Sequence, residues 1–347
     1  MKYGFMILIS LMICTMAAQT ISPLPITDYD YAIPANNVSA IAIGMGGINV
    51  TNQRDPFASY GNPALLANGD TTTLYMAYRI ADDANMGFWD AVNVSNFLRE
   101  KQFKYFSLVV KQGAVSYQPM ASVNISAIDP ETNRTMYYDY KLDKLQFSLG
   151  MTDKAWPSLT AGFNVKYLTG RLVYLVERLE GHQFIREQFI DDKVKGFSSD
   201  LGLTYRTGDV VYGISAYDLF SRMWWENYDS VSLQRRIAAG VQYGSGASKT
   251  SFGIQSKISS KPETTYHMGY SYAMNWDSND FYSDEQIRQG MDLRIGFYSD
   301  DFYGADNINL TLGGGYHYQV FRFDFSLNSK GLKIADSEFL FSLGMGF

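Results

Sequence analysis

Strict alternation of apolar and polar side chains marks the C-terminal end of the chain. Between Ser337 and Phe347, every second position is apolar, and mostly small or polar residues lie between. Successive side chains of a strand point to opposite faces of a sheet, so this pattern predicts a strand with one apolar face. The same alternation recurs upstream over 159–167, 265–276, 291–297, 307–320 and 321–328.

Sixteen candidate strands can be traced, and some are halves of longer, bulged strands. Bacterial barrels have even strand numbers, so we expect fourteen, with twelve or sixteen as alternatives. The candidates are Thr72–Arg79, Phe103–Lys111, Ala114–Ile125, Thr135–Leu142, Lys144–Thr152, Ser158–Thr169, Arg171–Leu179, Phe197–Arg206, Val210–Leu219, Ser232–Tyr243, Thr250–Ser259, Thr264–Trp276, Met291–Tyr298, Asn307–Gln319, Phe321–Ser329 and Glu338–Phe347.

The segments between the candidate strands are less regular. The alternation changes phase at Asp143-Lys144 and at Val320-Phe321, which predicts a turn or a bulge at each point. The charged, poorly periodic stretches Glu177–Lys195 and Asp277–Gln286 are expected to be long external loops. Helix-like spacing of apolar residues over Phe88–Lys101 predicts a short helix.

A soluble β-sandwich also alternates, so three further features decide the fold class. One face carries large residues without interruption, which suits lipid outside and a wet lumen inside. The 26 Tyr and 5 Trp suit aromatic girdles at the membrane interfaces. The aromatic C-terminal residue, Phe347, resembles the signal that outer-membrane barrels present to their assembly machinery. We therefore predict an all-β protein, a transmembrane antiparallel β-barrel with an N-terminal luminal hatch, in the bacterial outer membrane and in contact with its lipid.

The first residues predict export. Lys2 precedes an apolar run that ends at Met16-Ala17-Ala18, which is typical of a signal peptide over residues 1–18 and is shorter than a membrane-spanning helix. Cleavage there removes Cys14, the single cysteine, so the mature chain has no disulfide. It also leaves 28 basic against 35 acidic residues, a net charge of −7, so nucleic acid is not an expected partner.

The segment that precedes the first strand does not alternate. Residues 19–70 are too polar to lie in lipid and too glycine-rich for a stable helix, so we expect them to form a plug inside a barrel of residues 71–347. Gly44, Gly46 and Gly47 have neither the strand–turn–helix context nor the following lysine of a phosphate loop. The motif Asn62-Pro63-Ala64 is a functional hatch contact or a simple turn.

A family resemblance rests on these residues. The glycines at 44, 46 and 47, the acidic residue Asp55 and the motif Asn62-Pro63-Ala64 resemble the N-terminal hatch of FadL-type transporters and of the related PorV/PorQ outer-membrane proteins. Residues 160–168, 200–206 and 315–325 are similar to later strands of that family. The resemblance implies a fourteen-stranded barrel closed by a hatch, with no cofactor.

The family contains more than one function, and a shared fold does not choose between them. FadL-type members pass hydrophobic compounds, often by lateral exit through the barrel wall, and this is the function we expect, with an apolar binding pocket between hatch and wall. PorV-type members serve type IX secretion and receive secreted proteins, which is the alternative. A structural outer-membrane protein is the third possibility.

Chemistry-bearing residues are few, and no enzyme is predicted. We expect six residues on polar strand faces to point into the lumen, because a charge facing lipid is costly. The histidines do not form a metal site by spacing, and the acidic runs of the expected loops are read as solvated charge rather than calcium ligands. The six lumen-facing residues are His267, Asp292, Arg294, His317, Arg322 and Asp324.

Overall fold

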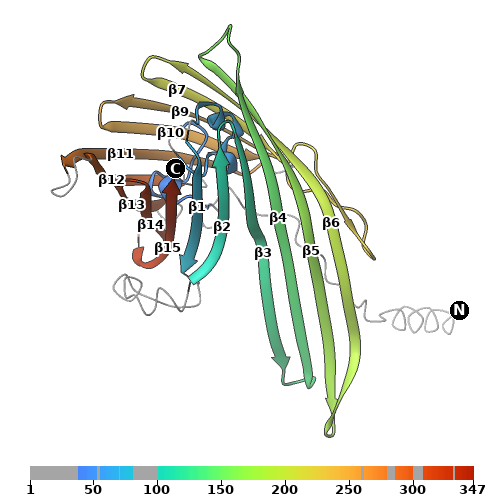
Figure 1. The fold of residues 1–347 in the computed structure, drawn as a ribbon. Coiled ribbons are helices and arrows are strands. Elements are labelled where there is room, and N and C mark those ends of the chain that lie inside the picture. Colours follow the sequence, from blue (N-terminus) through green and yellow to red (C-terminus); the bar gives the residue numbers. More distant parts are fainter. Residues whose placement is uncertain are drawn as a thin grey trace, which may run out of the picture.

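The computed structural model describes residues 38–52, 55–69, 71–80, 101–258, 262–279, 286–299, 308–330 and 333–347. Fifteen strands form one antiparallel sheet that closes on itself around an N-terminal plug (Figure 1). The predicted signal peptide (residues 1–18) and the predicted helix over Phe88–Lys101 lie outside the described residues, apart from Lys101, which begins β2.

The strands follow one another as antiparallel neighbours almost throughout the chain. They are β1 (Thr73–Ile80), β2 (Lys101–Val110), β3 (Gly113–Asp129), β4 (Arg134–Thr152), β5 (Leu159–Glu180), β6 (Gln183–Thr207), β7 (Val210–Tyr217), β8 (Arg222–Trp225), β9 (Arg236–Ser245), β10 (Ser248–Lys257), β11 (Thr264–Asn279), β12 (Gln286–Ser299), β13 (Ile308–Tyr318), β14 (Phe321–Lys330) and β15 (Lys333–Gly346).

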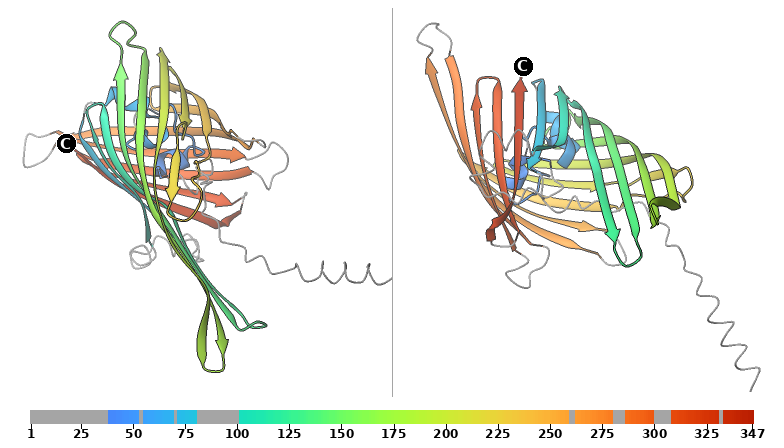
Figure 2. Two further views of the ribbon diagram at one scale, coloured as in Figure 1. Left: turned by 90° about the vertical axis from the view of Figure 1, so that its right-hand side faces the viewer. Right: turned by 90° about the horizontal axis from the view of Figure 1, so that it is seen from below.

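Fourteen of these strands make the ring, as the sequence predicted. The ring closes where β1 pairs with β15, with Thr73 opposite Gly346. The remaining strand, β8, is a short branch that pairs with β6 beyond the end of β7, while β9 pairs directly with β7. Figure 2 shows the ring from two further directions, with the short helices enclosed in it.

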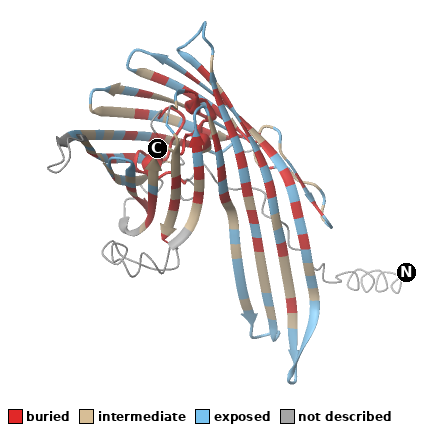
Figure 3. Ribbon diagram, in the orientation of Figure 1, coloured by how far each residue is buried: buried red, intermediate tan, exposed pale blue. Residues whose placement is uncertain are grey.

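The hatch is the described part of the N-terminal segment. It contains the short helices α2 (Ala40–Gly44) and α3 (Ala58–Gly61) and the 3₁₀ helix η2 (Pro63–Asn68). Ser39 caps α2 by accepting a hydrogen bond from Ala42 N, and Asn62 caps η2 by accepting one from Ala64 N. Nearly all of its side chains are buried, because the barrel wall surrounds it (Figure 3).

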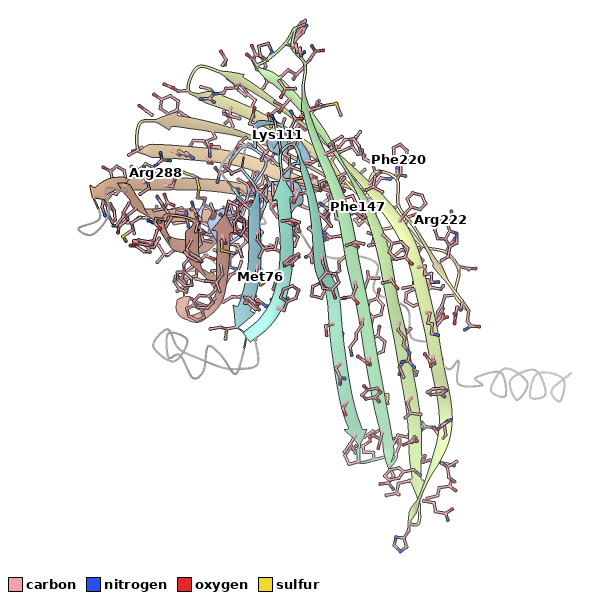
Figure 4. The ribbon with its side chains drawn as sticks, viewed as in Figure 1. Met76, Lys111, Phe147, Phe220, Arg222 and Arg288 are labelled. Atoms are coloured by element: carbon pink, nitrogen blue, oxygen red, sulfur yellow. The ribbon has the colours of Figure 1, made fainter. Side chains whose placement is uncertain are left out.

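The outer face of the wall is apolar over most strands. Phe147, which projects from β4 in Figure 4, is 52% exposed, and Leu201 on β6 and Phe252 on β10 are similarly exposed. The side chains between them point inward and are small, polar or charged. Such an inside-out pattern suits a barrel wall that faces lipid. None of the helices in the described ranges is long and apolar enough to cross a membrane.

The strands β3 to β6 continue beyond the rest of the ring as a long extension, which we call the blade (residues 118–142 and 168–196; Figure 1). In the blade the two faces exchange character. On β4, Lys144 points inward and Leu145 outward, but only a few residues away Tyr140 is buried inside and Lys141 is exposed outside. The blade therefore has a mostly polar outer face, apart from the row of Tyr137, Leu175 and Phe189, and a mostly apolar inner face.

This exchange explains one wrong expectation. The phase change predicted at Asp143-Lys144 is neither a turn nor a bulge of β4, since Leu142 and Lys144 both point inward along one continuous strand. The bulge lies opposite, in β3, between Pro119 and Ala121. The polar and apolar residues of β4 exchange faces there, because the strand leaves the part of the wall whose outer face is apolar. The second phase change is a turn, because β13 ends at Tyr318 and β14 begins at Phe321.

The prediction of a long external loop over Glu177–Lys195 is also wrong. These residues are the paired ends of β5 and β6, joined by a tight turn at Gly181-His182. A bulge between Val176 and Glu177 and the many paired charges hide the alternation. In the other expected loop, Asp277–Asn279 belong to β11 and Gln286 to β12, whereas 280–285 lie outside the described residues.

Candidate functional site: the hatch and the lumen beside it

The hatch backbone lies directly against glycines of the wall. A Cβ at Gly162 would overlap the backbone of Pro63 and Ala64, and one at Gly296 would overlap Gly46. We call this set the glycine seat, because the missing side chains let the backbone or side chains of the hatch approach the strands closely. Its members, from β4 round to β13, are Gly150, Gly162, Gly202, Gly213, Gly253, Gly269, Gly296 and Gly313.

Asn62 ties the hatch to the seam between β6 and β7. Its side-chain amide nitrogen donates to Val50 O at 2.9 Å, and also lies 3.2 Å from Leu203 O and 3.4 Å from Ile214 O. Its side-chain oxygen is the cap of η2, at 3.0 Å from Ala64 N. Asn62 is fully buried, so these bonds replace all of its contacts with water.

The motif Asn62-Pro63-Ala64 therefore acts as a structural joint. Pro63 and Ala64 are buried against β5, and the following Leu65 and Leu66 pack with Val109 and Ala114 of the wall. A small polar cavity, described below, lies between hatch and wall.

The glycines at 44, 46 and 47 form the turn that follows α2. Gly46 has a φ of +81°, and its N–H donates to Thr311 Oγ1 at 3.1 Å. Its carbonyl oxygen lies 2.5 Å from Nδ1 of His267, whose Nε2 is 2.7 Å from Thr265 Oγ1. The structure thus places His267 inside the barrel, where it holds this turn of the hatch.

Asp55 is buried at the centre of the hatch. It accepts hydrogen bonds from Ser39 Oγ and from Phe57 N, both at 2.8 Å. Burial raises the pKa of Asp55 to about 6, and the nearby charge of Asp324 raises it further, while the two hydrogen bonds and Arg322 oppose the rise. Asp55 therefore links Ser39, which caps α2, to Phe57, which precedes α3. The strength of this link depends on whether the carboxyl group of Asp55 is protonated.

Four of the predicted lumen-facing residues form one ion-pair cluster, which we call the charge box. Arg294 Nη2 lies 2.8 Å from Asp324 and 3.0 Å from Asp292. Arg322 lies 2.7 Å from Asp292 and 2.8 Å from Asp324. These residues belong to β12 and β14, and they meet across β13 because Gly315 between them has no side chain.

The remaining predicted residues are more isolated. His317 lies on the inner face of β13, beside Gly290, and its Nδ1 has no hydrogen-bond partner among the described residues. Phe347 follows β15, and its side chain is 70% exposed at the outer edge of the barrel, while its N–H donates to Thr72 O. In the described ranges, no group of three or more His, Cys, Asp or Glu side chains is placed to hold a metal.

A second charged group, not singled out by the sequence, lies between the hatch and the wall. Lys166 lies 2.6 Å from Asp200 and 2.9 Å from Asp218, and Arg236 lies 3.3 Å from Asp218. Lys144 lies over the ring of Tyr60 in the hatch, at 5.2 Å. Three basic side chains thus meet two acidic ones. The alternation of the sequence could have placed each of these residues inside the barrel. That they contact one another depends on the register of four strands and on the end of β7 just before Asp218.

These basic residues border the small polar cavity. Lys144, Lys166 and Arg236 line it on the wall side, and Asn49 and Tyr60 on the hatch side. Its volume of about 20 Å³ has room for one water molecule. The side-chain amide of Asn49 is buried there without a hydrogen-bond partner in the described part of the chain.

An apolar group lies directly above these charges on the same strands. Trp225 of β8 packs at 6.0 Å from the ring of Tyr140, and the fully buried Leu142 and Leu168 are the inward neighbours of Lys144 and Lys166. We call this group the apolar cluster. Its members are Tyr140, Leu142, Leu168, Leu172, Val194, Met223, Trp225 and Leu233.

The wall is split beside these groups. β2 pairs with β3 only from Phe106 to Val110, and the rest of β2 pairs with β1 alone. β3 continues into the blade from Gln118, so the two neighbouring strands diverge (Figure 1). The buried residues Tyr105 and Gln118 lie at the root of this split.

Together these features define a class: antiparallel β-barrels that are closed by an N-terminal hatch and have an apolar outer face. No family model matches the sequence, and no curated protein matches it. Among solved structures, the chain is similar to the toluene transporter TodX of Pseudomonas putida (12% identity, 89% of this chain and 96% of that chain, TM-score 0.53). It is also similar to a FadL homologue of Pseudomonas aeruginosa (11% identity, 89% and 98%, TM-score 0.54). At such identity the similarity establishes the fold, so the chain has the FadL-type barrel fold.

Proposed function

We propose that this protein is an outer-membrane barrel that passes hydrophobic compounds, with the hatch as its gate. The observation that carries the proposal is the exchange of faces in the blade. It produces a mostly apolar inner surface in a part of the wall whose outer face is mostly polar. A wall in water has no need of such a surface unless something apolar lies on it.

The apolar inner surface leads toward the hatch. Val123, Tyr138 and Tyr174 line the blade and pack against the apolar cluster or its neighbours. The cluster in turn adjoins the basic residues above the hatch. A compound that enters from the blade would meet apolar side chains first and then Lys144 and Lys166, an order that suits an apolar body with a polar or anionic end.

The hatch and the split wall give the rest of the route. The contacts of the hatch with the glycine seat and its place beside the charge box support selective passage rather than an open pore. The split between β2 and β3 offers a lateral path from the lumen to the apolar outer face, near Tyr105 and Gln118. One of the similar structures is a toluene transporter, which agrees with apolar cargo.

Uptake of radiolabelled toluene and of a long-chain fatty acid by cells that express the protein tests this proposal. Trp225→Lys places a charge in the apolar cluster and should reduce uptake about tenfold or more. Trp224→Lys is the matched control, because Trp224 is the adjacent residue on the opposite face and is 50% exposed. Replacement of Asn62 or deletion of the hatch should change the flux as well, because either loosens the gate.

A folded barrel is distinguished from a misfolded one by its heat-dependent mobility in detergent gels. If folded Trp225→Lys takes up both compounds like the wild type, the proposal is wrong. Unchanged uptake together with lost surface display of secreted proteins would favour the secretion role instead.

A further inference from the structure

Among the described residues, one edge of the blade has no neighbouring strand. β3 pairs with β4 along its whole length, from Gly113 to Asp129, but its pairing with β2 stops at Tyr117. From Gln118 to Asp129, no described residue pairs with β3 on the side that faced β2. The backbone N–H and C=O groups on that side form a ladder without a second strand, and the side chains of Ser122, Asn124 and Ser126 around it are exposed.

This edge lacks the usual protection against strand pairing. Natural edge strands carry charged residues, prolines or bulges that prevent another strand from adding. Here the proline and the bulge lie at the root, at Pro119 and Met120, and the first charge is at the tip, at Asp129. The nine residues from Met120 to Ile128 contain no charge, proline or glycine, and they carry β-branched side chains at 123, 125 and 128.

The side chains on the two faces of β3 indicate which kind of strand would fit beside this edge. Val123 and Ile125 lie on the inner face, in register with Tyr140 and Tyr138 of β4, and continue its apolar surface. Ser122 and Asn124 lie on the outer face with Lys141 and Asp139. A strand added here would therefore place apolar side chains inward and polar side chains outward, with no charge required.

A second copy of this chain is a poor occupant. Copies in one membrane point the same way, so a two-fold axis that relates them runs along the membrane normal. Such an axis cannot bring two β3 edges together as antiparallel neighbours, and it would set the apolar face of one blade beside the polar face of the other. Lipid and small solutes offer no repeating backbone ladder.

We propose that the edge of β3 from Gln118 to Asp129 is a β-augmentation site for an extended segment of another protein that carries no net charge. The partner adds as a strand beside β3, and its apolar side chains extend the inner face of the blade. This inference goes beyond the transport of hydrophobic compounds and does not depend on it. A barrel could carry either activity without the other.

The test uses the full mature protein in detergent and a fluorescein-labelled peptide of sequence TMYYDYKL. This is the sequence of Thr135–Leu142, the part of β4 that pairs with Ala121–Ile128 along the other edge of β3. We expect saturable binding by fluorescence anisotropy, with slower amide hydrogen exchange in residues 120–128. A peptide N-methylated at every second residue, which cannot complete the ladder, should not bind.

Two variants place the peptide on this edge. Ile125→Lys puts a charge at a 55% exposed inner position of the edge and should weaken binding at least tenfold. Met136→Lys puts the same charge on the same face of β4, which has partners on both sides and is 42% exposed there, and should leave binding within about twofold. Equal binding of the N-methylated peptide, equal loss in both variants, or no binding at all by the folded wild type would overturn the proposal. Dimerisation of the protein through this edge would also overturn it.

Discussion

Several polar side chains of the hatch and lumen are buried and held by hydrogen bonds or ion pairs. Asn62, Asp55 and the four residues of the charge box are all held by neighbours from distant parts of the chain. Removal of one partner leaves the other buried without compensation, so each of these residues is expected to be sensitive to substitution.

Asp55 makes the docking of the hatch depend on pH. Its folded pKa of about 6 lies above its ordinary value of 3.8, so the folded state binds the proton more tightly than the unfolded state. Stability from this group is thus fully present below about pH 4 and is lost as pH rises through 6, by about 3 kcal/mol. Protease resistance of the hatch should fall between about pH 4 and 6 in the wild type and change little above pH 7. Asp55→Asn should abolish this pH dependence, and a dependence that persists in the variant would contradict the assignment.

The charge box and an exposed ion pair give a matched comparison. Arg294→Met removes a cation whose side chain is 2% exposed and leaves Asp324 with one partner fewer, so we expect a loss of about 3 kcal/mol in the free energy of unfolding. Arg171→Ala removes the pair with Asp191, where Arg171 is 57% exposed, and should cost at most about 1 kcal/mol. Urea unfolding in detergent measures both, and equal losses would show that burial is not what matters.

At the scale of the elements, the glycine seat explains why strands of this barrel tolerate so many glycines. Each lies at a point where a hatch residue touches the wall, so the strands give up side-chain packing to admit the plug. The charge box depends on the same device, since β13 carries glycine where the side chains of β12 and β14 meet.

A methyl group placed in the seat should displace the hatch. Gly162→Ala would force its Cβ into the backbone of Pro63 and Ala64, which cannot rotate away as a side chain can. Gly244→Ala is the control, because the nearest atom to its Cβ would be 3.7 Å away. We expect faster amide exchange across residues 58–68 in the first variant only, with the barrel still folded. Unchanged exchange in a folded Gly162→Ala barrel would show that the seat does not position the plug.

The sequence pattern predicted most of the strands, but it missed the parts of β5 and β6 where the outer face of the wall is not apolar. Alternation located the strands near the C-terminus because lipid and lumen impose opposite demands on the two faces. It failed over Glu177–Lys195, where water lies outside and charges such as Arg178 and Glu187 pair across strands. The group of Lys144, Lys166 and Arg236 was missed because no spacing in one strand reveals a meeting of several.

At the scale of the whole molecule, the barrel is closed by its last strand. β15 pairs with both β14 and β1, so the residues near Phe347 complete the seam. Deletion of Phe347 should reduce the amount of folded barrel in the outer membrane several-fold, because the terminal aromatic is expected to be read by the assembly machinery. Heat-modifiable protein in membrane fractions measures this. Replacement of Phe347 by Tyr should restore assembly, and full assembly without any terminal aromatic would contradict the expectation.

The position of the seam also constrains the order of events during folding. The hatch precedes β1 in the chain, yet it ends enclosed by a wall whose two edges meet only when the final strand is in place. The hatch contacts strands from β4 round to β13, so we expect it to lie on the growing sheet before β1 and β15 meet. Pairing across so long a stretch of chain is slow, because its entropy cost comes before its contacts. We therefore expect the plug to serve as a template, around which the sheet curves before it closes.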